Sequence, residues 1–292
     1  MTPRTIGIAG AGRVGQALAR LLRDAGQPVA AVASRTPERS REGASFAGAG
    51  IVATTYAELP RRASHLIVAV PDSAIGTVAE QLAVNAAGGV ALHTCGARGP
   101  EALSALARRG VSCGTLHPLQ TVSTPLQGIA GMRGIAFAVS GDAAALAWAR
   151  EIAALLGGET LDIREGARPL YHAAAVMASN YVVALAGAAQ TLMAETGVAP
   201  DRALRALAPL MRAALENSVE QGPERALTGP IERGDAATVA AHMDALAAVP
   251  EIESFYRAAG LYTLRLARRR GLADGPARAV ERALLANCDV ED

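Results

Sequence analysis

Residues 5–22 read TIGIAGAGRVGQALARLL, a short apolar run followed by a glycine-rich turn and then a helical pattern of leucine and alanine. Gly10 permits a tight turn, Gly12 lets a ligand approach the backbone, and Gly15 lets the helix pack closely on the strand. The N–H groups at the start of such a helix have no partner within it and favour an anion. The stretch therefore predicts a strand, a turn and a helix that bind a dinucleotide pyrophosphate at Gly10, Ala11, Gly12, Arg13, Val14 and Gly15.

Short runs rich in β-branched residues recur along the first half of the chain, with helix signals between them. Thr36-Pro37 and Gly99-Pro100 each place proline at a first helical position, and we expect Asp72 and Asp142 to be N-caps. This alternation is typical of a doubly wound, mostly parallel α/β sheet with crossover helices. The expected strands are residues 5–9, 28–34, 65–70, 90–94, 114–117, 135–140 and 159–163.

The second half of the chain has a helical pattern throughout. Its first expected helix, residues 167–196, would be about 45 Å long at 1.5 Å per residue and would end at Gly197. Further helices are expected at residues 201–221, 235–246, 252–271 and 276–288. The sequence therefore predicts a Rossmann-type nucleotide-binding domain at residues 1–163, followed by a smaller all-helical domain for substrate and dimerisation at residues 164–292.

The second expected strand ends in Ser34-Arg35, where a site that prefers NAD carries Asp or Glu for the ribose 2′-hydroxyl. A hydroxyl and a guanidinium suit a 2′-phosphate, which a carboxylate would repel. The sequence thus favours NADP over NAD. A surface role for Arg35 is the alternative. The next strand ends in Val70-Pro71, at the carboxyl edge where open sheets hold their ligands, so we expect both residues beside the cofactor.

All 28 basic residues are arginine, and the formal net charge is only +1. The missing lysine excludes Schiff-base and pyridoxal-phosphate chemistry on this chain, a P-loop, and a lysine proton donor. Near-neutral charge without a cationic-aromatic pattern argues against nucleic-acid binding, and no membrane span is expected. Cys95, Cys113 and Cys288 are widely spaced, which favours a reducing compartment over disulfides or zinc. We expect a cytoplasmic protein without a signal peptide.

Histidines supply the candidate proton donors, because the pKa of an imidazole lies near neutrality. His93 and His117 end consecutive expected strands at the ligand edge, and His172 lies near the start of the long helix. Helical spacing places His172, Val176 and Ser179 on one face, with Asn180 adjacent. We expect His172 or His117 to be catalytic and His93, Ser179 and Asn180 to contact substrate; structural roles for these side chains remain the alternative. A metal site at His117, His172 and His242 has no ligand-spacing signature, so no metal is expected.

Several motifs together resemble one family. They are the glycine turn, Ser34-Arg35, Val70-Pro71-Asp72, residues 93–97 (HTCGA), 116–120 (LHPLQ), 171–176 (YHAAAV), 178–181 (ASNY) and 227–235 (LTGPIERGD). In this order they resemble the NADP oxidoreductases that join a Rossmann-like domain to the domain of unknown function numbered 2520. The resemblance spans nearly the whole chain. Cys95 stands where serine is expected, and Val122 stands where an aromatic residue is usual.

The family looks like a branch of the β-hydroxyacid dehydrogenase and pyrroline-5-carboxylate reductase superfamily, whose helical domain commonly helps form a dimer. In its hydroxyacid dehydrogenases a lysine precedes an asparagine by four positions on the corresponding helix. If Asn180 matches that asparagine, Val176 occupies the lysine position, and the resemblance cannot carry over the usual proton donor. His172, one turn earlier, is the candidate replacement.

The sequence therefore predicts a homodimeric NADP(H)-dependent oxidoreductase that transfers hydride to or from a small carbonyl, hydroxyacid or imine substrate. A non-catalytic NADP(H) sensor is the alternative, because the usual acid is missing. Imine reduction fits the loss of lysine better than hydroxyacid oxidation does, since some imine-reducing relatives also lack it. Residues 228–235 are expected to form a turn, with Asp235 as the cap of the next helix.

Overall fold

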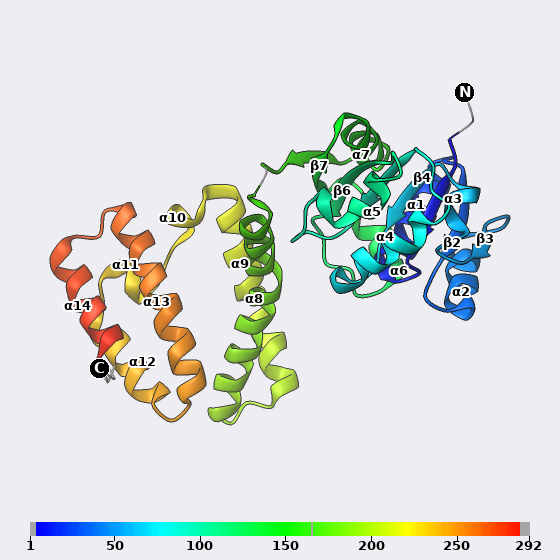
Figure 1. Cartoon of the computed structure of the whole chain (residues 1–292). Helices are drawn as coiled ribbons and strands as arrows, with labels where there is room; N and C mark the ends of the chain where they lie inside the picture. The colour runs from blue at the N-terminus through cyan, green and yellow to red at the C-terminus, as the bar shows by residue number, and fades with distance from the viewer. Residues whose placement is uncertain (1–3, 165, 287–292) are drawn as a thin grey trace. The chain divides into compact units, whose positions relative to one another are not determined.

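The computed structural model describes residues 4–164 and 166–286, and the chain divides into two compact units, Met1–Tyr181 and Val182–Asp292. The first unit holds one sheet with helices on both faces, and the second is helical (Figure 1). The division falls within α8 (Arg168–Glu195), whereas the domain boundary between residues 163 and 164 stays a prediction.

The sheet has eight strands in the order β3-β2-β1-β4-β5-β6-β7-β8. All neighbouring strands are parallel except β6 and β7. The strand order reverses between β1 and β4, and a ligand crevice forms at such a switch point. The doubly wound, mostly parallel sheet is thus confirmed. Its strands are β1 (Ile6–Ala9), β2 (Val29–Ala33), β3 (Val52–Thr54), β4 (His65–Val68), β5 (Val90–His93), β6 (Ser112–Pro118), β7 (Ala136–Gly141) and β8 (Glu159–Asp162).

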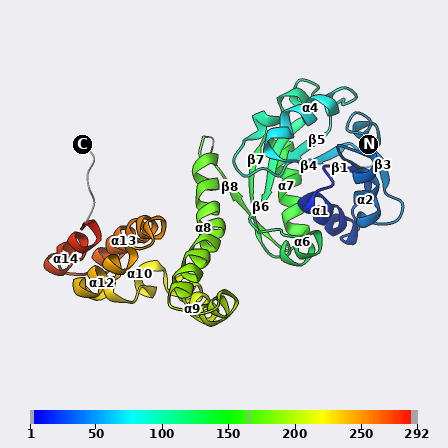
Figure 2. The same cartoon turned by 90° about the horizontal axis from the view of Figure 1, so that it is seen from below.

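Two apolar layers cover the sheet. One contains α1, α2, α6 and α7 and packs on side chains such as Ile8 and Phe137. The other contains α3, α4 and α5 and packs on side chains such as Ala91 and Cys113. Figure 2 shows α4 on one side of the strands and α1 and α6 on the other. The helices are α1 (Arg13–Asp24), α2 (Pro37–Ala47), α3 (Leu59–Arg62), α4 (Ile75–Ala83), α5 (Ser104–Ala107), α6 (Pro125–Gly131) and α7 (Ala143–Leu155), with 3-10 turns η1 (Asp72–Ala74) and η2 (Pro100–Leu103).

Helix starts test the capping predictions. Proline lies at the first position of α2 and of η2, as predicted. Asp142 caps α7 and accepts a hydrogen bond from the N–H of Ala145 at 3.1 Å. The predicted cap at Asp72 is wrong: Asp72 is the first residue of η1, Pro71 precedes it in the cap position, and no side-chain cap bond forms. A 3-10 turn begins directly after Pro71, one residue earlier than the expected helix. Asp72 is therefore inside the turn and not at its N-cap.

The second unit contains α9 (Pro200–Gln221), α10 (Pro223–Ala226), α11 (Pro230–Arg233), α12 (Ala236–Leu246), α13 (Pro250–Arg270) and α14 (Asp274–Leu285). Its core is formed by α11 to α14, with Val239, Leu264 and Val280 fully or nearly fully buried. The predicted cap is confirmed: Asp235 accepts from the N–H of Thr238 at 3.0 Å. The predicted turn at residues 228–235 contains α11 between Gly229 and Gly234, both at positive φ. Cys288 lies outside the described residues.

The long helices α8 and α9 are both almost wholly exposed. Arg168 is the only buried residue among the 28 of α8, and Ala203 is the only buried residue of α9. Met177 and Val183 are 60% and 72% exposed. By length and composition α8 is the one helix, among the described residues, that is apolar enough to cross a membrane. An apolar helix without a covered face is typical of a segment that is buried in an assembly or in lipid.

Candidate functional site

The glycine turn has the geometry that the sequence predicts. A Cβ on Gly10, which has φ +112°, would lie 2.2 Å from the carbonyl oxygen of Ala69, and a Cβ on Gly15 would lie 1.9 Å from the carbonyl oxygen of Gly10. Both positions therefore require glycine because the backbone closes on itself there. A Cβ on Gly12 would have no heavy atom within 4 Å, so this side of the turn is open to a ligand.

The first turn of α1 adds donors to this opening. Gly12 is its N-cap and supplies no side-chain hydrogen bond, so the first N–H groups of α1 lack intrahelical partners. Ala11 is buried, Arg13 is exposed, and Val14 packs against the sheet core. Gln16 donates from its side chain to the carbonyl of Ala11 at 2.8 Å and thereby fixes the turn. The arrangement can hold an anionic group at the helix N-terminus.

A cavity of about 570 Å³ lies at the carboxyl end of β2 and contains both residues predicted to select the cofactor, Ser34 and Arg35. The N–H of Ser34 donates to the Ser40 hydroxyl at 2.8 Å, which orders the strand end. Arg41 also lines the cavity, but its guanidinium pairs with Glu38 at 2.8 Å. No hydrogen bond or ion pair among the described residues engages the Arg35 guanidinium, so it can bind an incoming anion.

Tyr56 lines the same cavity and was not predicted from the sequence. Burial raises the pKa of its hydroxyl above the usual value, so the side chain stays neutral. An aromatic face in a nucleotide cavity can stack on a base. Tyr56 follows β3, a strand of three residues, and no periodicity can be recognised over so short a run. The strand order then brings the end of β3 beside the end of β2.

At the end of β4, Val70 lies directly beside the glycine turn. Its Cγ1 would lie 2.9 Å from a Cβ on Gly10. Pro71 is exposed at the same strand end. The structure thus gathers the glycine turn, Val70 and Pro71 at the switch point between β1 and β4.

A second cluster forms where β6 meets the start of α8. The Nδ1 atom of His117 and the hydroxyl of Tyr171 are 2.7 Å apart, and the ring centroids of His117 and His172 are 6.3 Å apart. Gly96 makes room for both histidines, since a Cβ there would lie 2.8 Å from the His172 ring and 2.9 Å from the His117 ring. The structure therefore brings together the two predicted proton donors, with Tyr171 and Gly96 as further members.

The surroundings of His117 set its protonation state. Burial, followed by the neighbouring His172 and Arg168, lowers the pKa of His117 to about 4. His117 is therefore neutral at pH 7. Burial also raises the pKa of the Tyr171 hydroxyl, which stays protonated. Tyr171 can then donate to Nδ1 of His117, which assigns the imidazole proton to Nε2, the nitrogen close to Gly96.

The surroundings of His93 indicate a structural role. Its side chain is fully buried; Nε2 lies 2.8 Å from the Gly99 carbonyl, and Nδ1 accepts from the N–H of Cys95 at 3.3 Å. Both ring nitrogens are thus used, and a direct contact of His93 with substrate stays a prediction. Burial, followed by Asp72, raises the pKa of the adjacent Cys95 thiol to about 11, so this cysteine stays protonated.

Arg168, the first residue of α8, is a buried cation that the sequence analysis missed. It is 5% exposed, and its Nη2 donates to the hydroxyls of Thr115 and Ser140. Its Cζ lies 6.0 Å from the centroid of the Tyr171 ring. Its position four residues before His172 on an otherwise apolar helix is the sequence signal that could have found it.

Among the described residues, no hydrogen bond joins Ser179 or Asn180 to the histidine cluster. The Ser179 hydroxyl lies 2.7 Å from the carbonyl of Ala175 and 3.0 Å from Oδ1 of Asn180, so its described contacts stay on its own helix. Asn180 is exposed and Val176 is half-buried. In the second unit, His242 bonds the hydroxyl of Tyr256 through Nδ1 at 2.8 Å. Substrate contacts of Ser179 and Asn180 stay predictions.

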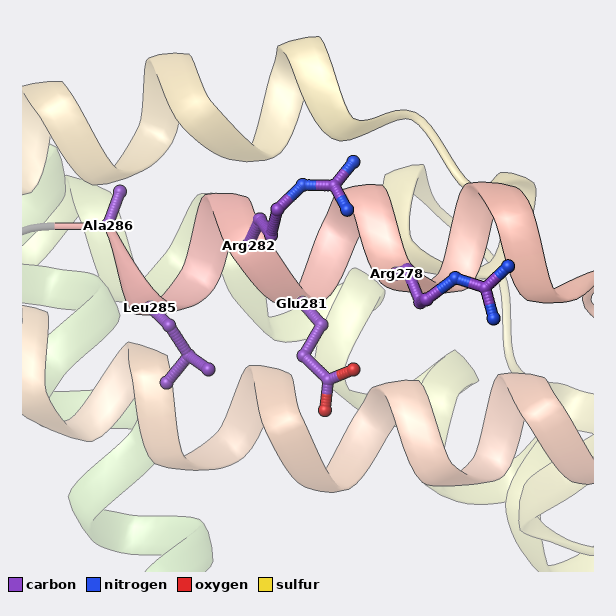
Figure 3. Close-up of a pocket in the computed structure, with 5 residues that line it drawn as sticks. All are labelled: Arg278, Glu281, Arg282, Leu285 and Ala286. Carbon is purple, nitrogen blue, oxygen red and sulfur yellow. The ribbon is translucent and has the colours of Figure 1, made fainter.

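No group of three His, Cys, Asp or Glu side chains within the described ranges is placed to hold a metal ion. A shallow hollow of about 410 Å³ on α14 is lined by Arg278, Glu281, Arg282, Leu285 and Ala286 (Figure 3). Glu281 pairs there with Arg268 at 2.7 Å. The hollow has no nucleophile, histidine or glycine turn and is not a candidate for the chemistry described above.

Two family models match this chain. A Rossmann-like domain matches residues 2–118, and the domain of unknown function DUF2520 matches residues 135–263. A search of curated proteins finds no match.

Solved structures with the same fold include a Thermotoga maritima protein (23% identity, TM-score 0.69), covering 90% of this chain and 98% of its own. A candidate NADP oxidoreductase from Bacteroides fragilis shares 24% identity with TM-score 0.67, covering 91% and 97%. A 1-pyrroline-5-carboxylate reductase from Streptococcus pyogenes shares 18% identity with TM-score 0.57, covering 96% of each chain. These similarities show a common fold.

Proposed function

We propose that this chain, which matches a Rossmann-like family model and a DUF2520 model, is a nicotinamide-dependent oxidoreductase that prefers NADP(H) and acts on a small carbonyl or imine substrate. The observation that carries the proposal is the cavity at the end of β2, where Ser34 and the unengaged Arg35 lie at the switch-point edge of the sheet. The names of the fold neighbours, an NADP oxidoreductase and a reductase among them, support the same class.

The residues present fit a dinucleotide. The open side of Gly12 and the free N–H groups of α1 would hold the pyrophosphate. Ser34 and Arg35 would hold the 2′-phosphate, and Tyr56 would face the adenine. When bound, the cofactor supplies or accepts the hydride, which the side chains of this chain cannot do.

The histidine cluster would handle the proton. His117, neutral and held by Tyr171, would donate a hydrogen bond from Nε2 to the substrate oxygen or nitrogen and orient it. His172, on the other side of Gly96, would give the proton to the reduced product or take it in the reverse direction. Because the pKa of His117 is far below neutrality, the assignment of the proton donor falls on His172.

A nucleotide titration tests the cofactor assignment. We expect NADPH to bind at least tenfold more tightly than NADH, and Arg35→Gln to abolish this preference, because the 2′-phosphate loses its charged partner. Arg39→Gln is the matched control: Arg39 is exposed, pairs with Glu42 and does not line the cavity. Equal affinities of the wild-type protein for NADPH and NADH would refute the NADP preference.

Turnover with a panel of small carbonyl and imine compounds tests the reaction. We expect His172→Gln to lower kcat by 10²-fold or more while leaving NADPH affinity unchanged. His242→Gln, far along the chain and bonded to Tyr256, is the control and should retain activity. NADPH binding without turnover on any compound would instead support a non-catalytic sensor, the alternative that the missing lysine raises.

We also propose that the protein is a soluble cytoplasmic homodimer in which a second copy covers α8. The support is that α8 exposes Leu170, Met177 and Val183 and buries only its first residue. Light scattering on the purified protein without detergent tests this proposal. A monodisperse monomer, or a requirement for detergent, would contradict it.

A further inference from the structure

The side chain of Arg168 is a buried charge that has no ion-pair partner among the described residues. Its Nε and Nη1 atoms are buried and have no hydrogen-bond partner among the described residues, while Nη2 takes the hydroxyls of Thr115 and Ser140. None of the described ion pairs includes it. Leaving a buried guanidinium with unused donors costs several kcal/mol in general, and folded proteins rarely retain such a group without a partner.

Arg168 lines a cavity of about 800 Å³, and all of the lining residues belong to the first compact unit. The cavity lies over β6 and β7, between η2 with α5 and the segment that follows β8. It contains neither the glycine turn nor Ser34 and Arg35, which lie at the opposite end of the strand order. The cavity is therefore separate from the proposed cofactor site.

The carboxylates on the cavity wall already have partners. Asp142 accepts from the N–H groups of Ala145 and Cys113, Asp162 pairs with Arg150 at 3.0 Å, and Glu101 accepts from the N–H of Gly99 at 2.9 Å. None of the described ion pairs joins these acids to Arg168, although the charge of Glu101 acts on it, and their charges disfavour a dianion such as phosphate. A ligand with a single negative charge fits this wall better.

The remaining wall is apolar and suits the carbon skeleton of a small molecule. It is formed in part by Pro100, Ala107, Val139, Leu146 and Ile163. Cavities of a few hundred Å³ that combine such a wall with one placed charge are typical ligand sites. Together, the unused guanidinium donors and the apolar wall define a ligand with a carboxylate at one end and hydrocarbon at the other.

We propose that this cavity is a second ligand site, which binds a small organic monocarboxylate through the guanidinium of Arg168. The site does not depend on the nucleotide. Arg168 links the cavity to the histidine cluster, because its Cζ lies 6.0 Å from the ring centroid of Tyr171, whose hydroxyl contacts His117. The bound carboxylate would therefore neutralise a charge beside the proposed reaction centre.

Thermal stability and calorimetry with pentanoate test the proposal, with pentanamide as the neutral isostere and ionic strength held constant. We expect pentanoate to raise the Tm of the wild-type protein in a dose-dependent way and pentanamide to have no effect. Arg168→Met should weaken pentanoate binding at least tenfold. Because it removes an uncompensated buried charge, it should leave the Tm of the free protein unchanged or higher. Arg108→Gln, an exposed arginine outside the cavity, is the charge-matched control and should bind as the wild type does.

A second variant keeps the test valid if Arg168→Met does not fold. Ala107→Trp fills the cavity from an exposed position on its wall and should weaken pentanoate binding without touching the guanidinium. Undiminished pentanoate binding in both variants would overturn the proposal. An equal response to pentanamide, or tighter Arg168-dependent binding of inorganic phosphate, would overturn the assignment to a monocarboxylate.

The Glu165→Gln variant tests whether a carboxylate of the chain itself occupies the site at Arg168. Glu165 precedes Arg168 by three positions and lies outside the described residues. We expect this variant to bind pentanoate as the wild type does. A wild-type protein that does not respond, together with a Glu165→Gln protein that does, would show that the chain's own carboxylate fills the site and would overturn the proposal.

Discussion

Two helices of this chain, α1 and α8, are both rich in alanine and leucine, yet they have opposite environments. Half of the 12 residues of α1 are buried, including Leu18, Leu21 and Leu22. Of the 28 residues of α8, only Arg168 is buried. The apolar residues of α1 lie on one face, which packs on the sheet, whereas those of α8 are distributed around the helix. Apolar composition alone therefore does not indicate whether a helix is packed within its own chain.

The two helices should differ most in how the protein responds to a charge placed on each of them. Leu18→Asp should unfold the sheet unit, because a carboxylate at a fully buried position costs more than about 4 kcal/mol. Val183→Asp, at a position that is 72% exposed, should leave the sheet folded and convert the proposed dimer into a monomer. Circular dichroism and light scattering measure the two effects. A Val183→Asp protein that stays dimeric would show that this part of α8 is not covered by a second copy.

A smaller difference in stability is expected between two glycine variants at the start of α1. Gly15→Ala should cost about 2–3 kcal/mol, because the added Cβ would meet the Gly10 carbonyl oxygen at 1.9 Å. Gly12→Ala should leave the free energy of unfolding within about 0.5 kcal/mol, since its Cβ would contact no protein atom, and should still weaken nucleotide binding at least tenfold. Urea unfolding and NADPH titration separate the two effects. Equal losses of stability in both variants would contradict this view of the turn.

The free energy of unfolding should depend on pH because of His117, which lies where the sheet meets the start of α8. The pKa of His117 is lowered to about 4 from its ordinary 6.5, so the folded protein binds fewer protons than the unfolded chain between these values. Stability should therefore fall as the pH drops from about 6.5 to about 4, by at most about 3 kcal/mol from this group. His117→Gln should show a shallower decline in urea unfolding measured across this range. An unchanged slope would mean that His117 is not a partly buried, neutral histidine.

The smallest contrast concerns two helix caps. Asp142→Ala should cost about 2 kcal/mol, since this carboxylate accepts from both Ala145 and Cys113, the latter on β6. Asp235→Ala should cost about 1 kcal/mol, because its bonds go only to Thr238 within the first turn of α12. Thermal melts of the two variants provide the comparison. A larger loss for Asp235→Ala would contradict the ranking.

The sheet was predictable because its signals are local. The Gly10–Gly15 turn, the proline at the start of α2 and the Asp142 cap each act within a few residues, and the structure has all three. The three-residue strand β3 was missed because it is too short to show periodicity. The cap at Asp72 was predicted wrongly because Pro71 starts a 3-10 turn that no local rule distinguished from a helix.

Less of the candidate site was predictable. His117 and His172 were both proposed from their positions at a strand end and on a helix, but their approach across Gly96 depends on how α8 begins beside β6. Tyr171 and Arg168 gain their roles through contacts with residues about 50 positions away, Tyr171 with His117 and Arg168 with Thr115. No spacing rule reaches that far along a chain.

The sequence by itself determined the doubly wound sheet, the glycine turn, the arginine in place of an acid at the end of β2 and the absence of lysine. These follow from backbone sterics, hydrophobic periodicity and composition, which act locally. Only the tertiary structure decided that His117 is partly buried and neutral, that both ring nitrogens of His93 contact backbone atoms and that Arg168 is a buried charge beside a cavity. Burial and charge compensation depend on which distant side chains surround a group, and the fold alone brings those side chains together.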